Sequence, residues 1–306
     1  MQPNKVLIIG LGSIAIKHIA ALRALNPLVE ITALRSDSLG PQIDTIKSVY
    51  TITEAEIAAY DFVIISNPSF LHAESIKKVG SHAKALFIEK PAFLSFKEGK
   101  DVVALIGDKL NYVACNLRFL DALVQVKKLL VEGLISPSLV QFQAVSYLPD
   151  WRPTQDYRLS YSASLEKGGG VVFDLIHEPD YIYWLFGESN ASYVKSGQYS
   201  DLAIQSPDTA VITFEYETFL VTGVLSYASK VSKRFLQITA KEGFFEVDLL
   251  SNSIMKNGTL IFSSEQRIND TYLQQMKHFV SVINGELAAV NDVKQALVLT
   301  KMLHLD

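Results

Sequence analysis

Two segments of the chain carry side chains that can transfer protons at places where the backbone turns. Glu89-Lys90-Pro91 follows a short apolar run that ends at Ile88. Proline restricts the residue before it to an extended or turn conformation, so the Lys90 amine can be aimed at a fixed point. A partly desolvated lysine amine can exchange a proton with a substrate hydroxyl near neutral pH. A Lys-Pro pair after a strand is also common in exposed turns, so Lys90 alone identifies no site.

The second segment follows a triple glycine at residues 168–170 and lies in an expected helix, residues 171–186. Positions three apart share one face of a helix, so Asp174, His177 and Asp180 would lie along one side of it. Carboxylates on either side of a histidine can hold it in one tautomer and stabilise its cationic form, which suits proton transfer. A histidine that is paired only for stability would show the same spacing.

The N-terminal region carries a glycine motif typical of dinucleotide binding. The sequence from Gly10 to Ala15 fits G-x-G-x-x-A and lies between an apolar run and an expected helix. Gly10 allows a tight turn, Gly12 lets the backbone approach a pyrophosphate, and the small Ala15 lets the helix pack on the strand. The first turn of the helix, which includes Ser13 and Ile14, would offer free N–H groups to the phosphates.

The end of the second expected strand bears on the choice between NAD and NADP. An NAD-binding chain usually has Asp or Glu there, about 20 residues after the glycines, bonded to the ribose 2′-hydroxyl. Here the strand ends in Arg35-Ser36, and a guanidinium and a hydroxyl suit a 2′-phosphate better. Asp37 follows. The sequence therefore favours NADP, with NAD as the alternative.

The order of the elements predicts how these residues are positioned. Up to residue 120, apolar strands alternate with helices, which predicts an α/β fold with a doubly wound parallel sheet. The expected strands are Val6–Ile9, Glu30–Leu34, Phe62–Ile65, Ala85–Ile88 and Tyr112–Ala114, and the expected helices are Ile14–Leu25, Phe70–Val79 and Phe96–Ile106. The glycine motif and Lys90 would then lie at the carboxyl edge of the sheet, where such sheets bind ligands.

From residue 121 onward the pattern changes, so we expect two domains, residues 1–120 and 121–306. Alternating apolar runs joined by turns such as Asn257-Gly258 predict antiparallel hairpins. The expected strands are Leu139–Tyr147, Val211–Tyr216, Leu220–Tyr227, Phe235–Ala240 and Phe244–Leu249, and the expected helices are Ala122–Glu132, Tyr272–Ile283 and Asp292–Leu305.

Taken together, these residues resemble the Gfo/Idh/MocA oxidoreductase family, which includes glucose-fructose oxidoreductase and inositol dehydrogenase. The matching features are Gly10 to Ala15, Asn67-Pro68 with Leu71-His72, Glu89-Lys90-Pro91, Asn116 with Arg118, and the triple glycine followed by Asp174, His177 and Asp180. The resemblance implies a Rossmann domain followed by an α/β domain with a large open, mostly antiparallel sheet. It also implies NAD(P)-dependent oxidation or reduction of a CH–OH group in a sugar, cyclitol or sugar nucleotide.

By the same resemblance, Lys90 and His177 would manage the substrate's hydroxyl proton, and Asp174 is the aspartate that precedes the histidine. The spacing Asp-Leu-Ile-His is one residue shorter than the family's usual D-x-x-x-H, which puts Asp174 in doubt. The cofactor would be bound by Gly10, Gly12, Ser13, Ile14, Arg35, Ser36, Asn67, Pro68, His72, Glu89, Lys90 and Asn116. The substrate would be bound by Lys90, Arg118, Trp151, Arg152, Tyr157, Arg158, Tyr161, Asp174 and His177.

The loop of residues 151–161 corresponds to a stretch that lies over the substrate in the family. Aromatic faces stack on sugars or bases, and arginines bind phosphate or carboxylate, so the loop favours a charged sugar or a nucleotide sugar. An ordinary loop at a sheet edge with its own salt bridges would have the same composition.

Composition argues against several other classes of function. The 306 residues include 28 Lys and Arg against 32 Asp and Glu, a net charge of −4 that gives no support to nucleic acid or an anionic membrane as partner. No apolar run approaches the ~18 residues of a membrane span, and no secretion signal is visible, so we expect a cytoplasmic protein. We expect no metal and no disulfide, because Cys115 is the only cysteine and His18, His82, His278 and His304 are isolated. These four histidines are expected at the surface.

Two other functions stay open at this point. A family member could use bound NAD transiently to cleave a glycoside without net redox change, or the chain could be a non-catalytic sensor of dinucleotides. A sensor would need neither Lys90 nor His177. The alternating apolar residues between Val211 and Leu249 also predict a sheet face that packs against a second subunit in a homodimer or homotetramer, unless they face only the internal core.

Overall fold

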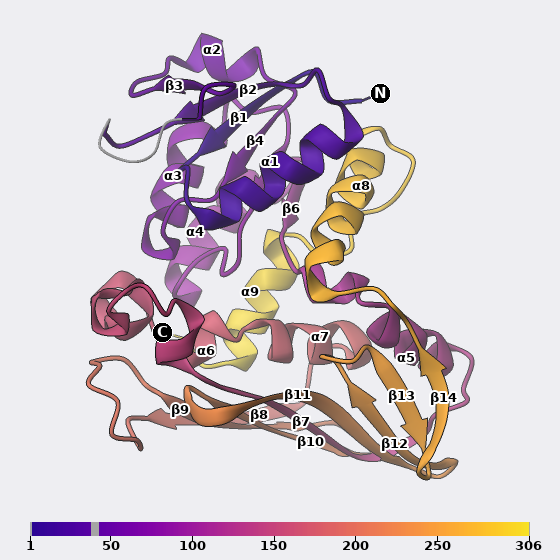
Figure 1. Cartoon of the computed structure of the whole chain (residues 1–306). Helices are drawn as coiled ribbons and strands as arrows, with labels where there is room; N and C mark the ends of the chain where they lie inside the picture. The colour runs from indigo at the N-terminus through magenta and orange to yellow at the C-terminus, as the bar shows by residue number, and fades with distance from the viewer. Residues whose placement is uncertain (1, 38–42, 306) are drawn as a thin grey trace. The chain divides into compact units, whose positions relative to one another are not determined.

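The computed structural model (Figure 1) describes residues 2–37 and 43–305. Contacts between residues divide these into two compact units. The first comprises the described residues up to Cys115 together with Tyr272–Thr300 and Leu305, and the second comprises Asn116–Thr271 and Lys301–His304. The C-terminal helices therefore pack largely with the N-terminal unit. As independently folding domains, the ranges 1–120 and 121–306 stay a prediction.

The first unit is built on a six-stranded parallel sheet in the order β3-β2-β1-β4-β5-β6. The strands are β1 (Lys5–Ile9), β2 (Glu30–Leu34), β3 (Lys47–Val49), β4 (Phe62–Ile65), β5 (Leu86–Ile88) and β6 (Asn111–Val113). The helices are α1 (Ser13–Leu25), α2 (Glu54–Ala58), α3 (His72–Val79), α4 (Phe96–Ile106), α8 (Thr271–Ile283) and α9 (Val293–Met302).

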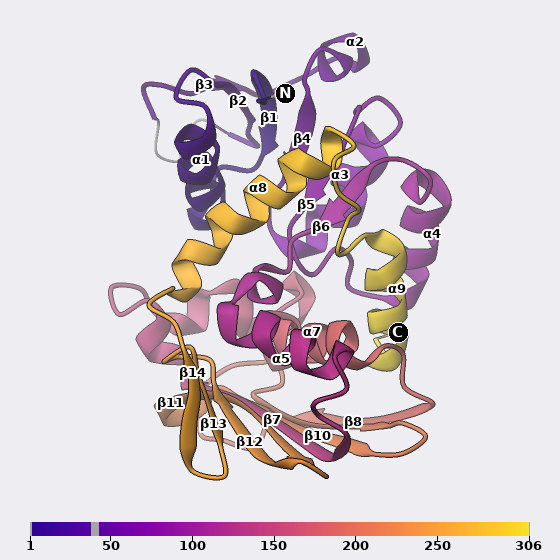
Figure 2. The same cartoon turned by 90° about the vertical axis from the view of Figure 1, so that its right-hand side faces the viewer.

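Helices cover both faces of this sheet, which explains the continuous apolar strands (Figure 2). On one face, the ring of Phe279 from α8 lies 4.9 Å from Phe62 and 5.2 Å from Phe87, measured between centroids. On the other face, residues of α3 and α4 such as Ile76 and Val102 join the strands in one buried cluster. The predicted doubly wound parallel sheet is confirmed.

The second unit is built on an eight-stranded sheet in the order β14-β13-β12-β11-β7-β10-β9-β8. All neighbouring pairs are antiparallel except β7 and β10, which are parallel. The strands are β7 (Pro137–Tyr147), β8 (Ala191–Gly197), β9 (Thr209–Glu215), β10 (Leu220–Ser226), β11 (Ala228–Ala240), β12 (Gly243–Asp248), β13 (Ser253–Lys256) and β14 (Thr259–Ser263). Helices α5 (Asp121–Val131), α6 (Val171–Asp174) and α7 (His177–Phe186) lie along one face of this sheet (Figures 1 and 2). The expected α/β unit with a large, mostly antiparallel sheet is confirmed.

The helix expected over residues 171–186 is wrong in one respect, because it is broken in two. Helix α6 ends at Asp174 and α7 begins at His177, with Leu175 at φ −99° and ψ 28° between them. Pro179 explains the break, because it has no N–H for the carbonyl of Leu175 four residues earlier and its ring would clash with that carbonyl. Asp174 and His177 therefore do not share the face of one continuous helix.

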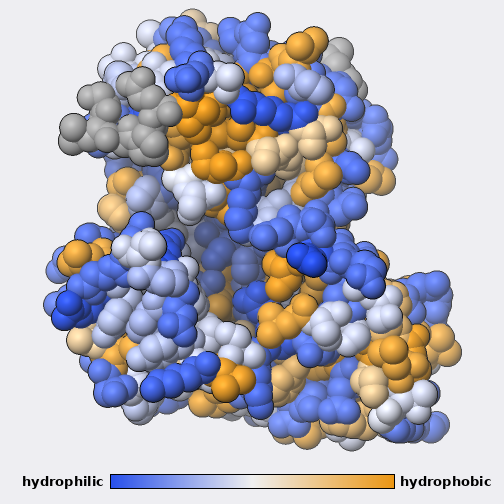
Figure 3. Space-filling model, viewed as in Figure 1, coloured by the Kyte–Doolittle hydropathy of each residue, from blue (hydrophilic) through white to orange (hydrophobic). Residues whose placement is uncertain are grey.

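Strand β14 leaves apolar side chains on the surface of the second unit. Leu260 and Ile261 are 56% and 47% exposed. Figure 3 shows hydrophobic side chains gathered at the lower right, over β13 and β14. This edge strand was not expected from the sequence, and it enlarges the surface that a second subunit could cover.

Candidate functional site

The glycine motif forms a turn whose two glycines have different tasks. Gly10 has φ +85°, donates its N–H to the carbonyl of Leu34 at 3.0 Å, and a Cβ placed on it would lie 2.6 Å from Cα of Asn67. Gly12 is the N-cap of α1 with φ −88°, and a Cβ on it would meet nothing within 4 Å. Gly10 is thus required by the fold, whereas Gly12 borders open space.

The open space lies in front of the first turn of α1. Gly12 offers no side-chain cap to the free N–H groups of this turn. Ser13 is exposed and Ile14 half-buried. Free N–H groups and the positive end of the helix dipole beside an uncrowded glycine suit the pyrophosphate of a dinucleotide. The residues present therefore fit a nicotinamide dinucleotide.

The residues expected to choose between NADP and NAD differ in exposure. Arg35 is 8% exposed, and its backbone N–H is bonded to the carbonyl of Val49 at 2.9 Å. Ser36 and Asp37 are exposed, and the Ser36 hydroxyl donates to the Asp37 carboxylate at 3.2 Å. A hydroxyl and a carboxylate, rather than a guanidinium, are the exposed groups at this strand end.

Lys90 lies at the same carboxyl edge of the sheet as the glycine turn. The N–H of Ser66 bonds to the carbonyl of Ile9, and the N–H of Glu89 bonds to the carbonyl of Ile65, both at 2.9 Å, so the three strand ends are linked in sequence. The Lys90 side chain is half-buried, and the peptide bond to Pro91 is cis. Glu89 itself is buried, so no exposed side chain supports its expected contact with the cofactor.

Two histidines beside this edge are buried. His18, expected at the surface, is 1% exposed, and its Nε2 lies 2.6 Å from Oε1 of Glu89, so that expectation is wrong. His72, expected to bind cofactor, is also 1% exposed, and its ring nitrogens lie 2.7 Å from the carbonyl oxygen of Pro91 and 2.8 Å from that of Asn67. Burial lowers the pKa of His72, although these two carbonyls oppose the shift. His72 thus ties two loops together, and its expected contact with a cofactor stays a prediction.

In the second unit, the Asp174 carboxylate is surrounded by tyrosines. The Tyr227 hydroxyl donates to Oδ2 of Asp174 at 2.6 Å, and Tyr161 is also hydrogen-bonded to this carboxylate. Burial, followed by the charge of Asp174, raises the pKa of both tyrosines. His177 begins α7 and is half-buried, whereas Asp174 is buried. Asp174 is therefore a fixed acceptor for two aromatic side chains.

Two other expected site residues have internal partners. The buried Arg118 guanidinium forms a two-pronged ion pair with Asp180, with N–O distances of 2.9 and 2.7 Å. The buried Asn116 amide donates to the hydroxyl of Thr271 at 2.7 Å. The Asp180 carboxylate, expected beside His177, thus stabilises the interior of the unit instead. In this structure neither Arg118 nor Asn116 presents its side chain to a surface that a ligand could reach.

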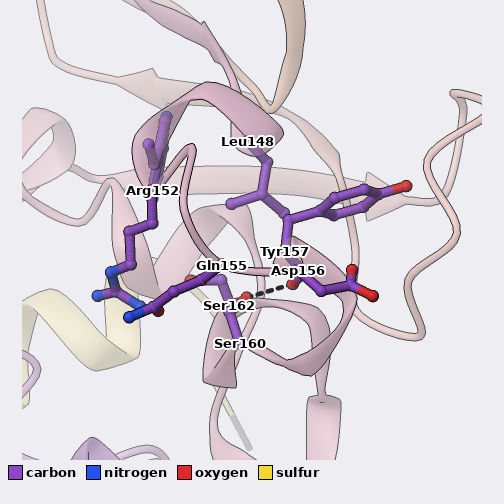
Figure 4. Close-up of a pocket in the computed structure, with 8 residues that line it drawn as sticks. Leu148, Arg152, Gln155, Asp156, Tyr157, Ser160 and Ser162 are labelled. Carbon is purple, nitrogen blue, oxygen red and sulfur yellow. Dashed lines mark hydrogen bonds between the residues drawn. The ribbon is translucent and has the colours of Figure 1, made fainter.

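The aromatic loop between β7 and α6 surrounds a small hollow that is open to solvent. It is lined by Leu148, Trp151, Arg152, Gln155, Asp156, Tyr157, Ser160 and Ser162. In Figure 4 the polar ends of Arg152 and Gln155 point to one side, and Tyr157 and Asp156 point to the other. Arg158 forms an exposed ion pair with Asp156, with Nη2 to Oδ2 at 2.6 Å.

This loop is fixed to the sheet and to Asp174 by aromatic contacts. The Trp151 ring meets the Tyr227 ring edge-on with centroids 5.3 Å apart, and the Arg152 guanidinium lies 5.7 Å from the Tyr161 centroid. Five residues of the loop were expected to bind substrate. Four of them belong to one connected cluster or line its hollow: Trp151, Arg152, Tyr157 and Tyr161.

Comparisons with known proteins agree with this architecture. Residues 4–117 match the family model of the Gfo/Idh/MocA oxidoreductases, described as an oxidoreductase family with an NAD-binding Rossmann fold. The chain is 28% identical over 195 residues to inositol 2-dehydrogenase from Rhizobium meliloti, covering 60% of this chain and 56% of the relative. The N-terminal part of the chain, residues 4–117, is therefore similar to the Gfo/Idh/MocA oxidoreductases.

The proteins that this chain resembles are named for different activities. The chain is 27% identical over 198 residues to 2,7-anhydro-N-acetylneuraminate hydratase from Escherichia coli, covering 62% of this chain and 52% of the relative. The chain thus spans about half the length of both curated relatives. The WlbA dehydrogenase from Chromobacterium violaceum, solved with NADH and UDP-GlcNAcA, has the same fold, with a TM-score of 0.84, 17% identity, and coverage of 100% of this chain and 93% of WlbA.

Proposed function

We propose that this protein is an NAD(P)-dependent oxidoreductase that transfers a hydride between nicotinamide and a hydroxyl or carbonyl group of a sugar, cyclitol or sugar nucleotide. The observation that carries the proposal is the sheet edge of the first unit, where Gly12 opens the start of α1 and Lys90 follows a strand linked to the same edge. The match of residues 4–117 to the oxidoreductase family model and the similarity to an inositol 2-dehydrogenase support it.

The chain's own residues would divide the work between binding and proton transfer. Gly12, Ser13 and Ile14 would hold the pyrophosphate through backbone N–H groups. A bound nicotinamide would supply the hydride chemistry, which belongs to the cofactor. Lys90 and His177 would each exchange a proton with the substrate oxygen as its bond order changes. We propose that Asp174, whose carboxylate accepts from two tyrosines, orients the aromatic loop instead of moving protons.

The preference for NADP stays a prediction, with NAD as the alternative. Arg35 supports NADP by its chemistry, but its burial and the exposed carboxylate of Asp37 support NAD. A carboxylate can accept a hydrogen bond from a ribose 2′-hydroxyl and repels a 2′-phosphate.

For the substrate, the loop hollow favours a carbohydrate with a charged or nucleotide group. Arg152 presents a cation and Trp151 and Tyr157 present aromatic side chains, the combination that binds a sugar attached to phosphate or carboxylate. The solved complex of WlbA holds UDP-GlcNAcA, a ligand of this kind.

A second candidate is a reaction in which bound NAD is reduced and reoxidised within one turnover, without net redox change. The observation that favours it is the similarity to a 2,7-anhydro-N-acetylneuraminate hydratase. Both candidates need Lys90 and His177 as proton-transferring groups, and they differ in whether reduced cofactor accumulates.

We also propose a homodimer or homotetramer formed through the face of the large sheet that α5–α7 leave uncovered. On β9, Ile212 and Phe214 are buried on the side covered by helices. Some of the alternating apolar residues therefore pack in the internal core. The opposite side still exposes Tyr193, Val211 and Leu220 by 60%, 49% and 45%. Among the described residues no helix is long and apolar enough to cross a membrane, and a cytoplasmic location stays a prediction.

The test is a kinetic comparison of Lys90→Ala and His177→Ala with the unmodified protein, using UDP-sugars and myo-inositol as probes. Each variant should lose about 10²- to 10⁴-fold in kcat, the usual contribution of a positioned acid or base. Affinity for NAD(P)H should stay nearly unchanged, because neither side chain is expected at the phosphates. Lys78→Ala, which removes an exposed lysine of α3, is the control. A variant that keeps full kcat would eliminate its residue from the proton path.

A further inference from the structure

His18 and Glu89 form a buried polar contact directly before Lys90. The distance from His18 Nε2 to Glu89 Oε1 is 2.6 Å, and the two residues are 1% and 6% exposed. The other carboxylate oxygen of Glu89, Oε2, accepts the backbone N–H of Lys90 at 3.2 Å. The carboxylate of Glu89 therefore links helix α1 to the backbone of Lys90.

The unpartnered nitrogen of His18 indicates how the proton is shared in this contact. His18 Nδ1 is buried and has no hydrogen-bond partner among the residues that the structure describes. A buried N–H group without an acceptor is unfavourable, which disfavours a proton on Nδ1. A neutral ring with its proton on Nε2 leaves no buried N–H group without an acceptor. The Nε2–H group then donates to an ionised Glu89. The carboxylate then keeps its negative charge beside Lys90.

The residue after Lys90 is fixed from the other side. His72 on α3 contacts the carbonyl oxygens of both Pro91 and Asn67. Asn67 in turn lies against Gly10, where a Cβ would find no room. The backbone is thus held before and after Lys90, while the Lys90 side chain stays half-buried.

One further charged group acts on Glu89. Burial lowers the pKa of Lys17, and the charge of Glu89 opposes this shift. Lys17 Nζ also lies 4.4 Å from the centroid of the Tyr272 ring. His18 contacts the Glu89 carboxylate through a short hydrogen bond and so fixes the position of Oε1.

We propose that His18 is a positioning residue for Lys90, acting through Glu89. The hydrogen bond from Nε2 holds the carboxylate in the place where its other oxygen accepts the backbone N–H of Lys90 and so anchors the Lys90 backbone. This inference rests on the proposed role of Lys90 in proton transfer. Its first consequence, however, is a change in the reactivity of the Lys90 amine, which can be measured without any substrate.

The experiment compares three variants in the full-length protein. His18→Leu removes the donor and leaves the Glu89 carboxylate buried without it. His18→Gln keeps a side-chain N–H donor at about the position of Nε2. His82→Leu is the matched control, because it breaks another His–Glu contact of the same unit, with Glu54 at 3.3 Å, whose side chains are 30% and 78% exposed.

The first measurement is the rate at which trace acetic anhydride acetylates Lys90 at pH 8, followed by mass spectrometry of the Lys90 peptide. Loss of the hydrogen bond to the Glu89 carboxylate should loosen the anchored Lys90 peptide and make the Lys90 amine more accessible. We expect His18→Leu to raise the rate about fivefold or more, and both His18→Gln and His82→Leu to stay within about twofold of the unmodified protein.

The second measurement is turnover, which should separate positioning from binding. His18→Leu should lower kcat about tenfold while the KM for NAD(P)H stays within about threefold, and His18→Gln should restore kcat. If His18→Leu does not fold, His18→Asn replaces it, because its amide is too short to reach the carboxylate from the same backbone position.

The two measurements test different claims, the role of His18 and the proposed function. Absence of turnover in the unmodified protein would contradict the proposed function, while the acetylation rates would still decide the role of His18. An acetylation rate and a kcat for His18→Leu equal to those of the unmodified protein would overturn the inference. So would equal losses in His18→Leu and His18→Gln, because the effect would then come from the shape of the side chain and not from its donor.

Discussion

Alanine substitutions at Gly10 and Gly12 should separate folding from cofactor binding. In Gly10→Ala the new Cβ would lie 2.6 Å from Cα of Asn67, and the residue would have to keep φ +85°. The left-handed conformation costs an alanine about 1–2 kcal/mol, and forcing a methyl group into a filled space costs about 1–3 kcal/mol. We expect Gly10→Ala to lower the free energy of unfolding by about 2–5 kcal/mol.

Gly12→Ala should leave stability nearly unchanged and weaken cofactor binding. The new Cβ meets nothing within 4 Å, and φ −88° with ψ −173° is open to any residue. Stability should change by less than about 1 kcal/mol, the difference between glycine and alanine at an N-cap. The methyl group would, however, keep a pyrophosphate away from the N–H groups of the first turn of α1. Loss of hydrogen bonds to a charged group, about 1.5–3 kcal/mol, corresponds to a roughly 10- to 150-fold rise in Kd.

The assay pairs thermal unfolding with a fluorescence titration of NADH and NADPH for both variants. The expected result is an unstable Gly10→Ala and a stable Gly12→Ala that binds neither form well. A stable Gly12→Ala with unchanged affinity for both cofactors would refute the assignment of the pyrophosphate to this turn.

Four further outcomes follow from the structure. Arg35→Ala should weaken NADP(H) more than NAD(H) if the predicted NADP preference holds, and an unchanged NADP(H) constant in the fluorescence titration would discard it. Arg118→Met leaves the buried Asp180 unpaired and should lower the free energy of unfolding, measured in urea, by about 3–5 kcal/mol. Lys77→Met removes an ion pair that is about half exposed and should lower it by less than about 1 kcal/mol. Asp208 is buried, and burial alone would raise its pKa, but hydrogen-bond donors of the β8–β9 loop lower it. Asp208→Asn should therefore lower the free energy of unfolding by about 1–3 kcal/mol at pH 7. Because a lowered pKa gives stability that is lost as pH falls below the unfolded value near 3.8, this cost should shrink in unfolding measured at pH 3. Light scattering at micromolar concentration should give a mass of two or four chains, and the mass of one chain throughout would contradict the proposed interface.

The parallel sheet of the first unit could be predicted because its signals are local. Continuous apolar strands such as Phe62–Ile65 and the glycine motif from Gly10 each show in a few consecutive residues. The short strands β3 and β13 and the edge strand β14 carry few apolar residues on a buried side, so no periodicity marks them. The β7–β10 parallel pair could not be predicted either, because it joins segments far apart in the sequence.

The candidate site was predicted less completely, because partners of charged side chains are set by tertiary contacts. Arg118 and Asp180 are 62 residues apart in sequence, and nothing local shows that they pair. Two signals were available and would have helped. His18 has the helical spacing of the buried Ala15 and Leu22, and Pro179 marks the break that separates Asp174 from His177.

The most direct test of the proposed oxidoreductase is absorbance at 340 nm when NAD(P)⁺ and a panel of UDP-sugars and myo-inositol are added to the purified protein. We expect reduced cofactor to accumulate with at least one of these probes, in proportion to the substrate consumed, and this accumulation to disappear in Lys90→Ala. Substrate consumption without any lasting rise at 340 nm would contradict net hydride transfer and favour the redox-neutral reaction.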